Sequence, residues 1–147
     1  MAPITIFTIG FSRKSAAEFF SLLEKAEVRR VLDIRLNNTS QLAGFAKHPN
    51  LAFFFHRILG IEGTHSPEMA PSKEILDAYK KHRIDWQEYE RQFKALLASR
   101  RIEEVFSPDL LNKSCLLCTE PQADRCHRRL VAEYLQAKWG DVKVVHL

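Results

Sequence analysis

The sequence predicts one α/β domain over residues 1–147, a three-layer unit in which helices flank a mainly parallel sheet of roughly five strands. Two observations support this prediction. Short apolar runs rich in β-branched residues recur along the chain, and stretches with helical spacing of apolar residues separate them. Strands that alternate with helices in this way pair in parallel through right-handed crossovers. We see no internal repeat, low-complexity segment or linker, so one domain accounts for the length.

The first half of the chain predicts two strands and two helices, each with a signal at its boundary. Apolar runs mark the strands, a capping box opens the first helix, and a glycine ends the second. These elements are strands at residues 4–9 and 31–34, a helix opened by Ser15 and Glu18, and a helix over residues 50–59 that Asn50 caps and Gly60 ends. Residues 36–49 lack periodicity and predict a long loop, a kind of segment that is often functional.

The second half predicts three strands and three helices. The strands lie at residues 61–65, 114–118 and 142–146, and the helices are capped by Ser72, Asp85 and Asp124. We expect the apolar faces of these helices, which include Trp86, Tyr89 and Leu130, to pack in the core. Charged residues near helix ends, such as Lys80 and Arg83, predict solvated surface.

The composition excludes several classes of protein. Hydrophobic residues make up 46% and charged residues 27%, which excludes a disordered tail, a fibrous repeat and a disulfide mini-scaffold. No apolar run approaches the roughly 18 residues of a membrane span, and no basic stretch precedes the apolar start. We therefore expect a cytoplasmic protein without a membrane partner. The net charge of +4 favours anionic partners, and the sequence does not indicate an oligomeric state.

Three cysteines, Cys115, Cys118 and Cys126, lie close together in the last third of the chain. In a reduced compartment, an odd and clustered set of cysteines indicates a catalytic or metal-binding role rather than a disulfide framework.

Polar residues gather where three of the predicted strands end. Because ligands of open α/β sheets bind at the carboxyl ends of the strands, these residues would face one crevice if the strands are neighbours. They are Gly10 and Ser12 after the first strand, Asp33 and Arg35 at the second, Cys118 and Glu120 after residues 114–118, and Cys126, His127 and Arg128 at the next helix.

Cys126 has two interpretations. If Asp124 caps the helix, Cys126 lies at the second helical position, where free backbone N–H groups and neighbouring cations such as Arg125 favour a thiolate. Such a thiolate can act as a nucleophile, and the same helix end can hold a phosphate. Alternatively, Cys126 is a small, inert core residue.

A zinc site is a competing interpretation of the cysteines. Cys115 and Cys118 have the spacing of half a zinc site, but residues three apart on a strand point to opposite faces. Cys126 and His127 would diverge by about 100° on a helix. These geometries argue against four ligands, and they leave zinc at Cys118 and Cys126 with an outside ligand such as His65 as the minor alternative. We expect no metal.

The remaining candidates each have a functional and a structural interpretation. Asp33 and Arg35 share one side of a strand, so they form either a structural ion pair or a joint substrate contact, with Arg35 suited to phosphate or carboxylate. Glu120 is either a general acid or base or a solvated loop carboxylate. Ser12 either bonds a ligand or forms a turn.

Several segments together resemble the family catalogued as domain of unknown function 488. They are Thr8-Ile9-Gly10-Phe11-Ser12, Asp33-Ile34-Arg35, Cys115-Leu116-Leu117-Cys118-Thr119-Glu120, Cys126-His127-Arg128, Ala132-Glu133-Tyr134-Leu135 and Val144-Val145-His146. The likeness runs from about residue 4 to the end of the chain. It implies a compact α/β fold of a bacterial or archaeal cytoplasmic protein whose activity is not established.

The family pattern matches all nine candidate residues listed above, from Gly10 to Arg128. Two departures stand out. Phe11 stands where members commonly carry His, so a role for that imidazole does not apply. Cys115 stands where members often carry an apolar residue, which weakens the Cys-x-x-Cys zinc interpretation.

We therefore expect an enzyme, a hydrolase or transferase, with a crevice for a phosphate-bearing or other anionic substrate such as a nucleotide or nucleic acid. No motif implies an organic cofactor. Two alternatives stay open: a non-catalytic module that binds nucleotides or nucleic acid, and an interaction protein whose polar motifs stabilise the fold. The catalytic candidates are Cys118, Glu120, Cys126 and Asp33, and the substrate-binding candidates are Gly10, Ser12, Arg35, His127 and Arg128.

Overall fold

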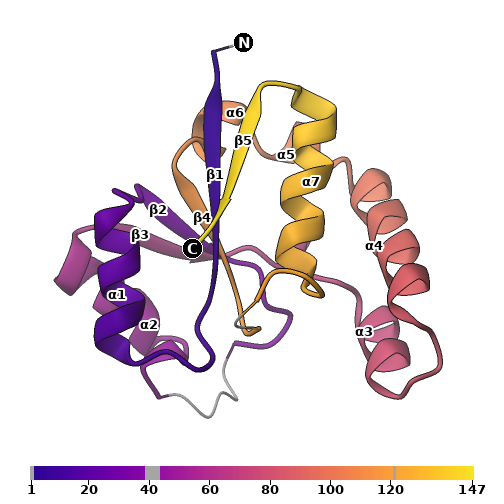
Figure 1. Cartoon of the computed structure of the whole chain (residues 1–147), viewed down its shortest axis with the longest axis horizontal. Coiled ribbons are helices and arrows are strands. Elements are labelled where there is room, and N and C mark those ends of the chain that lie inside the picture. The colour runs from indigo at the N-terminus through magenta and orange to yellow at the C-terminus, as the bar shows by residue number, and fades with distance from the viewer. Residues whose placement is uncertain (1, 39–43, 121) are drawn as a thin grey trace.

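Five parallel strands form the central sheet, and helices cover both of its faces (Figure 1). The structure, a computed structural model, describes residues 2–38, 44–120 and 122–147. The strand order is β3-β2-β4-β1-β5, so the predicted α/β fold with a parallel sheet is confirmed. The strands are β1 (Ile4–Gly10), β2 (Arg30–Asp33), β3 (Glu62–His65), β4 (Ser114–Cys118) and β5 (Val142–His146).

Helices from the two halves of the chain cover opposite faces of the sheet (Figure 1). One face carries α1 (Ala16–Lys25) and α2 (Asn50–Phe54), the latter continued by the π-helical segment η2 (Phe55–Leu59). The other face carries α7 (His127–Trp139) and α4 (Trp86–Arg100), with α3 (Lys73–Lys80) beside α4. Within the described ranges, no helix is long and apolar enough to cross a membrane.

Side chains of β4 alternate between two apolar cores. Cys115 and Leu117 pack with Phe19 of α1 and Phe55 of η2, whereas Leu116 packs with the side chains of α4 and α7. This alternation follows from the two-residue period of an extended strand. It sends Cys115 and Cys118 to opposite faces, as the sequence predicts.

The position of β4 brings the predicted site segments together. It lies between β2 and β1, so it is the central strand of the sheet. Its register sets Cys118 beside Gly10 on β1 and Leu117 beside Asp33 on β2. The carboxyl ends of these three strands are therefore neighbours, which is the arrangement that a shared crevice requires.

Two helices begin at other residues than predicted. Asn50 is the first residue of α2 and not its cap, since Pro49 holds the N-cap position without a side-chain bond. At α7 the prediction that Asp124 is the cap was wrong: Cys126 is the N-cap and the helix starts at His127. A turn closed by a 3.2 Å hydrogen bond from Cys126 N to Ala123 O comes before the helix, so the helix starts later than predicted. The residue type at position 124 does not indicate this turn.

Short elements fill the regions between the long ones. The predicted loop at residues 36–49 contains a single 3₁₀ turn, η1 (Gly44–Ala46), in its described part, whereas residues 39–43 lie outside the described residues. A second 3₁₀ turn, η3 (Pro67–Met69), follows β3. Two four-residue helices that the sequence did not predict, α5 (Ile102–Val105) and α6 (Pro108–Leu111), lead from α4 to β4.

Candidate active site

A cleft of about 440 Å³ opens at the carboxyl ends of β2 and β4. Its walls are the loops after these strands, the end of α3, the first turn of α4 and the start of α7. Five of the nine predicted site residues line it: Arg35, Cys118, Glu120, Cys126 and His127. The cleft lies at the carboxyl ends of the strands, where ligands of open α/β sheets usually bind. It contains nucleophilic, basic and acidic side chains together.

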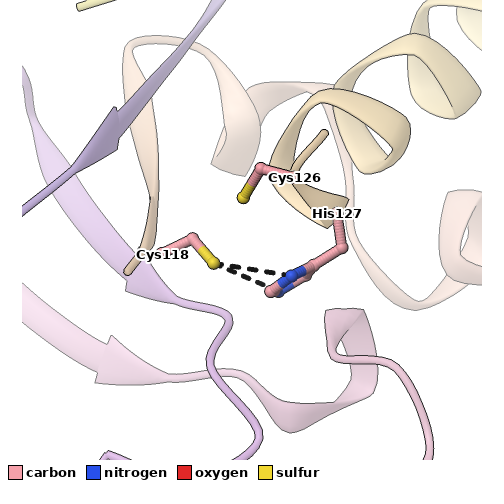
Figure 2. Close-up of side chains that lie close together, drawn as sticks. All are labelled: Cys118, Cys126 and His127. Atoms are coloured by element: carbon pink, nitrogen blue, oxygen red, sulfur yellow. Dashed lines mark hydrogen bonds between the residues drawn. The ribbon is translucent and has the colours of Figure 1, made fainter. Parts of the chain in front are cut away.

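Cys118 and His127 lie close together in the cleft (Figure 2). The Sγ atom of Cys118 lies 3.5 Å from Nδ1 of His127 and 3.8 Å from its Nε2. The same Nε2 lies 2.7 Å from the carbonyl oxygen of Ile34. A carbonyl only accepts, so Nε2 is the donor there, and Nδ1 is the unprotonated nitrogen of the neutral ring, next to the Cys118 thiol. The ring of Phe93 packs edge-on against His127 and helps to hold its orientation.

Cys126 completes this group because of the way α7 begins. Its backbone is extended, with φ −132° and ψ 141°, so Cys126 and His127 do not diverge as two helical residues would. The ligand atoms of Cys118, Cys126 and His127 all lie within 4.8 Å of one another, and the three side chains face each other in Figure 2. The expectation that Cys126 and His127 diverge by about 100° was therefore wrong.

The three cysteines differ in their affinity for a proton. A hydrogen bond from the Cys126 thiol lowers the pKa of Cys118, and backbone N–H groups of Thr119 and Glu120 and the charge of Arg128 act in the same direction against the effect of burial. The pKa of Cys126 is raised, chiefly because its proton is shared with Cys118. Burial raises the pKa of Cys115. Among the three thiols, Cys118 is the one whose environment favours the thiolate.

Asp33 lies outside the cleft lining and holds Arg35 in place. The carboxylate accepts bonds from Nε and Nη2 of Arg35 at 2.8 and 2.7 Å, and Arg35 Nη2 also donates to the carbonyl of Ala46 at 2.8 Å. Both residues are buried, and the Arg35 guanidinium also lies over the ring of Phe11. Within the described part of the chain, Nη1 of Arg35 has no hydrogen-bond partner. The pair matches the structural interpretation, and Arg35 also lines the cleft.

Gly10 and Ser12 are also not among the residues that line the cleft. Gly10 packs against the loop after β4, where an added Cβ atom would lie 1.5 Å from the carbonyl oxygen of Glu120. Ser12 is half-buried, and its backbone N–H donates to the carbonyl of Thr119 at 3.1 Å. Both residues therefore fix the loop that follows Cys118, and neither faces the cleft.

Arg128 is only 1% exposed and lies behind the cleft wall. Its guanidinium donates to Oγ1 of Thr8 at 3.2 Å and to the carbonyl oxygen of Glu120. The prediction that Arg128 contacts substrate does not fit this burial. Its charge acts at a distance instead, since it lowers the pKa of Cys118.

Several residues of the cleft were not predicted as site residues. The sequence assigned Lys80 to solvated surface and Trp86 and Tyr89 to the core, but all three line the cleft. The rings of Trp86 and Tyr89 stack at the start of α4, with their centroids 4.9 Å apart. Arg125 was considered only as a neighbour of Cys126. Helical periodicity indicates which face of α4 is apolar, but it does not show that the first turn extends past the core to the carboxyl edge of the sheet. The unpredicted residues with aromatic or cationic side chains are Tyr79, Lys80, Trp86, Tyr89 and Arg125.

Comparison with known proteins identifies the family. The family described as "Domain of unknown function DUF488" matches residues 15–135, which includes every cleft residue named above, whereas Gly10 and Ser12 precede the matched range. The chain belongs to this family. No curated protein and no solved structure matches the chain.

The close approach at Gly10 predicts a large effect of Gly10→Ala. The new methyl group would meet backbone atoms of Glu120 and Nη1 of Arg128, and a backbone carbonyl cannot move aside without displacing the loop. We expect the free energy of unfolding to fall by about 3 kcal/mol, measured by urea denaturation. Gly44→Ala is the control, since a Cβ atom there meets nothing within 4 Å. Equal effects of the two substitutions would contradict this account of Gly10.

The buried ion pair predicts that Asp33→Asn is strongly destabilising. It leaves the Arg35 guanidinium, which is 3% exposed, without its countercharge. We expect a loss of about 3 to 5 kcal/mol in the free energy of unfolding by urea denaturation. Asp141→Asn, at an exposed position, should change it by less than about 0.5 kcal/mol. A small effect of Asp33→Asn would show that Arg35 does not depend on this carboxylate.

Proposed function

We propose that this chain is a cytoplasmic enzyme, a hydrolase or transferase, that acts on a phosphate-bearing or other anionic substrate through Cys118. The observation that supports the proposal best is the 3.5 Å contact between Cys118 Sγ and His127 Nδ1 at the wall of the cleft. A thiol beside an imidazole whose other nitrogen is held by a carbonyl is the arrangement of an activated cysteine nucleophile.

The cations of the cleft support an anionic substrate. Arg35, Lys80 and Arg125 line it, and Lys80 and Arg125 are exposed and free to move toward a ligand. Asp33 balances the charge of Arg35 in a buried pair, so Lys80 and Arg125 supply the positive charge that is available to a ligand. Glu120 is the only carboxylate among the described residues that line this cleft.

A two-step transfer follows from these roles. The proton of Cys118 passes to Nδ1 of His127, and the thiolate attacks the electrophilic atom of the substrate. A bond from sulfur to that atom forms as the bond to the leaving group breaks, and the leaving group takes the proton from His127. Water or a second acceptor then attacks the covalent intermediate and releases Cys118. Glu120 is the candidate base that accepts the proton of this second nucleophile.

Two alkylating reagents of similar size test the proposal without knowledge of the substrate: iodoacetate is anionic and iodoacetamide is neutral. On protein freed of metal by a chelator, we expect Cys118 to be modified first. The ratio of the iodoacetate rate to the iodoacetamide rate should exceed that of 2-mercaptoethanol by on the order of 5-fold, because the nearby cations stabilise an anion by about 1 kcal/mol. Mass spectrometry of the digested protein identifies the cysteine and follows the rates.

Matched substitutions separate the cleft cations from charge elsewhere. Arg125→Gln and Lys80→Gln should each lower the ratio, whereas Arg83→Gln, at an exposed position outside the cleft lining, should leave it unchanged. A ratio equal to that of 2-mercaptoethanol, or modification of Cys115 or Cys126 ahead of Cys118, would contradict the proposal.

A non-catalytic module for nucleotides or nucleic acid is the second candidate. It is favoured by the aromatic side chains of Tyr79, Trp86 and Tyr89 beside the cations of the same cleft. Such a module needs the cations but not the thiol. Binding of adenosine monophosphate or a short single-stranded DNA that weakens steeply with salt, and that Cys118→Ser retains in full, would favour this candidate over the enzyme.

A further inference from the structure

The proposed reaction uses Cys118 and His127 but gives Cys126 no role of its own. Cys126 is nevertheless only 3% exposed, and its Sγ belongs to a group with Cys118 Sγ and a ring nitrogen of His127 in which all atoms lie within 4.8 Å of one another. Two thiols and an imidazole are ligands of a soft or borderline metal ion, and they are not the oxygen ligands that Mg²⁺ or Ca²⁺ prefers.

We propose that Cys118, Cys126 and His127 bind one thiophilic divalent cation, for which Zn²⁺ fits best, with the fourth coordination position open to the cleft. Zinc–sulfur and zinc–nitrogen bonds of about 2.3 and 2.1 Å in a tetrahedron set ligand atoms about 3.6 to 3.8 Å apart. The 3.5 Å between Cys118 Sγ and His127 Nδ1 is already this distance. The rest of the group needs to contract by no more than about 1 Å, which side-chain torsions can supply.

The surroundings of His127 support the same inference. Histidines that bind metal usually donate the other ring N–H to a carbonyl or carboxylate, which fixes the tautomer and the orientation of the ring. His127 donates from Nε2 to the carbonyl oxygen of Ile34 at 2.7 Å, and its Nδ1 lies 3.5 Å from Sγ of Cys118. The tautomer that leaves Nδ1 unprotonated, as a metal ligand must be, is therefore set before any metal is present.

The cleft supplies the open position. All three side chains line it although each is less than 9% exposed, so an ion that they hold would contact the cleft on one side. Three protein ligands and one exchangeable position are typical of zinc sites that bind water or substrate. Binding releases the thiol protons to solvent, and two thiolates then balance the charge of the ion, so the loaded site is neutral overall.

This inference goes beyond the proposed function, because a metal-bound Cys118 is a ligand and no longer a free nucleophile. The protein would then exist in two forms. The metal-free form has a reactive thiol at Cys118, and the loaded form has an unreactive thiol and an ion facing the cleft.

Direct titration tests the site without an activity assay. Zn²⁺ is added to the chelator-treated protein in competition with a chromophoric chelator, and we expect saturation at one ion per chain. Cys118→Ser, Cys126→Ser and His127→Gln should each weaken binding by more than about 10-fold, since loss of even an outer contact costs that much. Cys115→Ala is the matched control, because this thiol lies on the opposite face of β4 and should leave affinity unchanged.

Two readouts need no substitution and so do not depend on the variants folding. Zn²⁺ should protect Cys118 and Cys126 together from iodoacetamide, and Co²⁺ in place of Zn²⁺ should give an absorption band from thiolate-to-metal charge transfer. Absence of saturable binding, absence of protection, or undiminished binding in any of the three ligand variants would overturn the proposal. Such a result leaves the anion selectivity of the metal-free thiol as it was, so the two proposals fail separately.

Discussion

The buried guanidinium of Arg128 joins the three segments on which the candidate site depends. It extends from the first turn of α7, donates to Thr8 on β1, and donates to the carbonyl oxygen of Glu120 in the loop after β4. Because a buried cation must keep its hydrogen bonds, these contacts fix the β4 loop against β1, and the absence of a side chain at Gly10 lets the loop come close enough. The same charge favours the thiolate of Cys118. One residue thereby links the packing of the sheet to the chemistry at its edge.

The start of α7 decides what that chemistry can be. With Cys126 as an extended N-cap and His127 as the first helical residue, both side chains reach the sulfur of Cys118 at the end of the central strand. A helix that began two residues earlier would separate them by about 100° and leave a lone cysteine–histidine contact. The local turn from Ala123 to Cys126 is therefore the feature that allows one group of atoms to serve as an activated thiol or as a set of metal ligands.

The polar residues that the sequence singles out form two groups with different roles. Arg35, Cys118, Glu120, Cys126 and His127 line the cleft, where they can touch a ligand. Asp33, Gly10, Ser12 and Arg128 are close in sequence to these residues, but they hold the strands and loops in position. A motif match cannot separate the two groups, because one motif contains both the residues that can contact a ligand and the residues that hold them in position.

Local sequence determined the five strands, the longer helices and the end of the sheet at which the site forms. Apolar runs and capping boxes mark most of the strands and helices, since these signals depend on neighbours within a turn or two. The sequence also indicated that Cys115 and Cys118 face opposite ways, because a strand has a fixed side-chain period. Only the tertiary structure decided that Trp86 and Lys80 form a cleft wall and that Arg128 is buried. It also decided that the side chains of Cys126 and His127 both come close to Cys118. Each of these features depends either on packing between segments that are distant along the chain or on one hydrogen-bonded turn. The type of a single residue specifies neither the packing nor the turn.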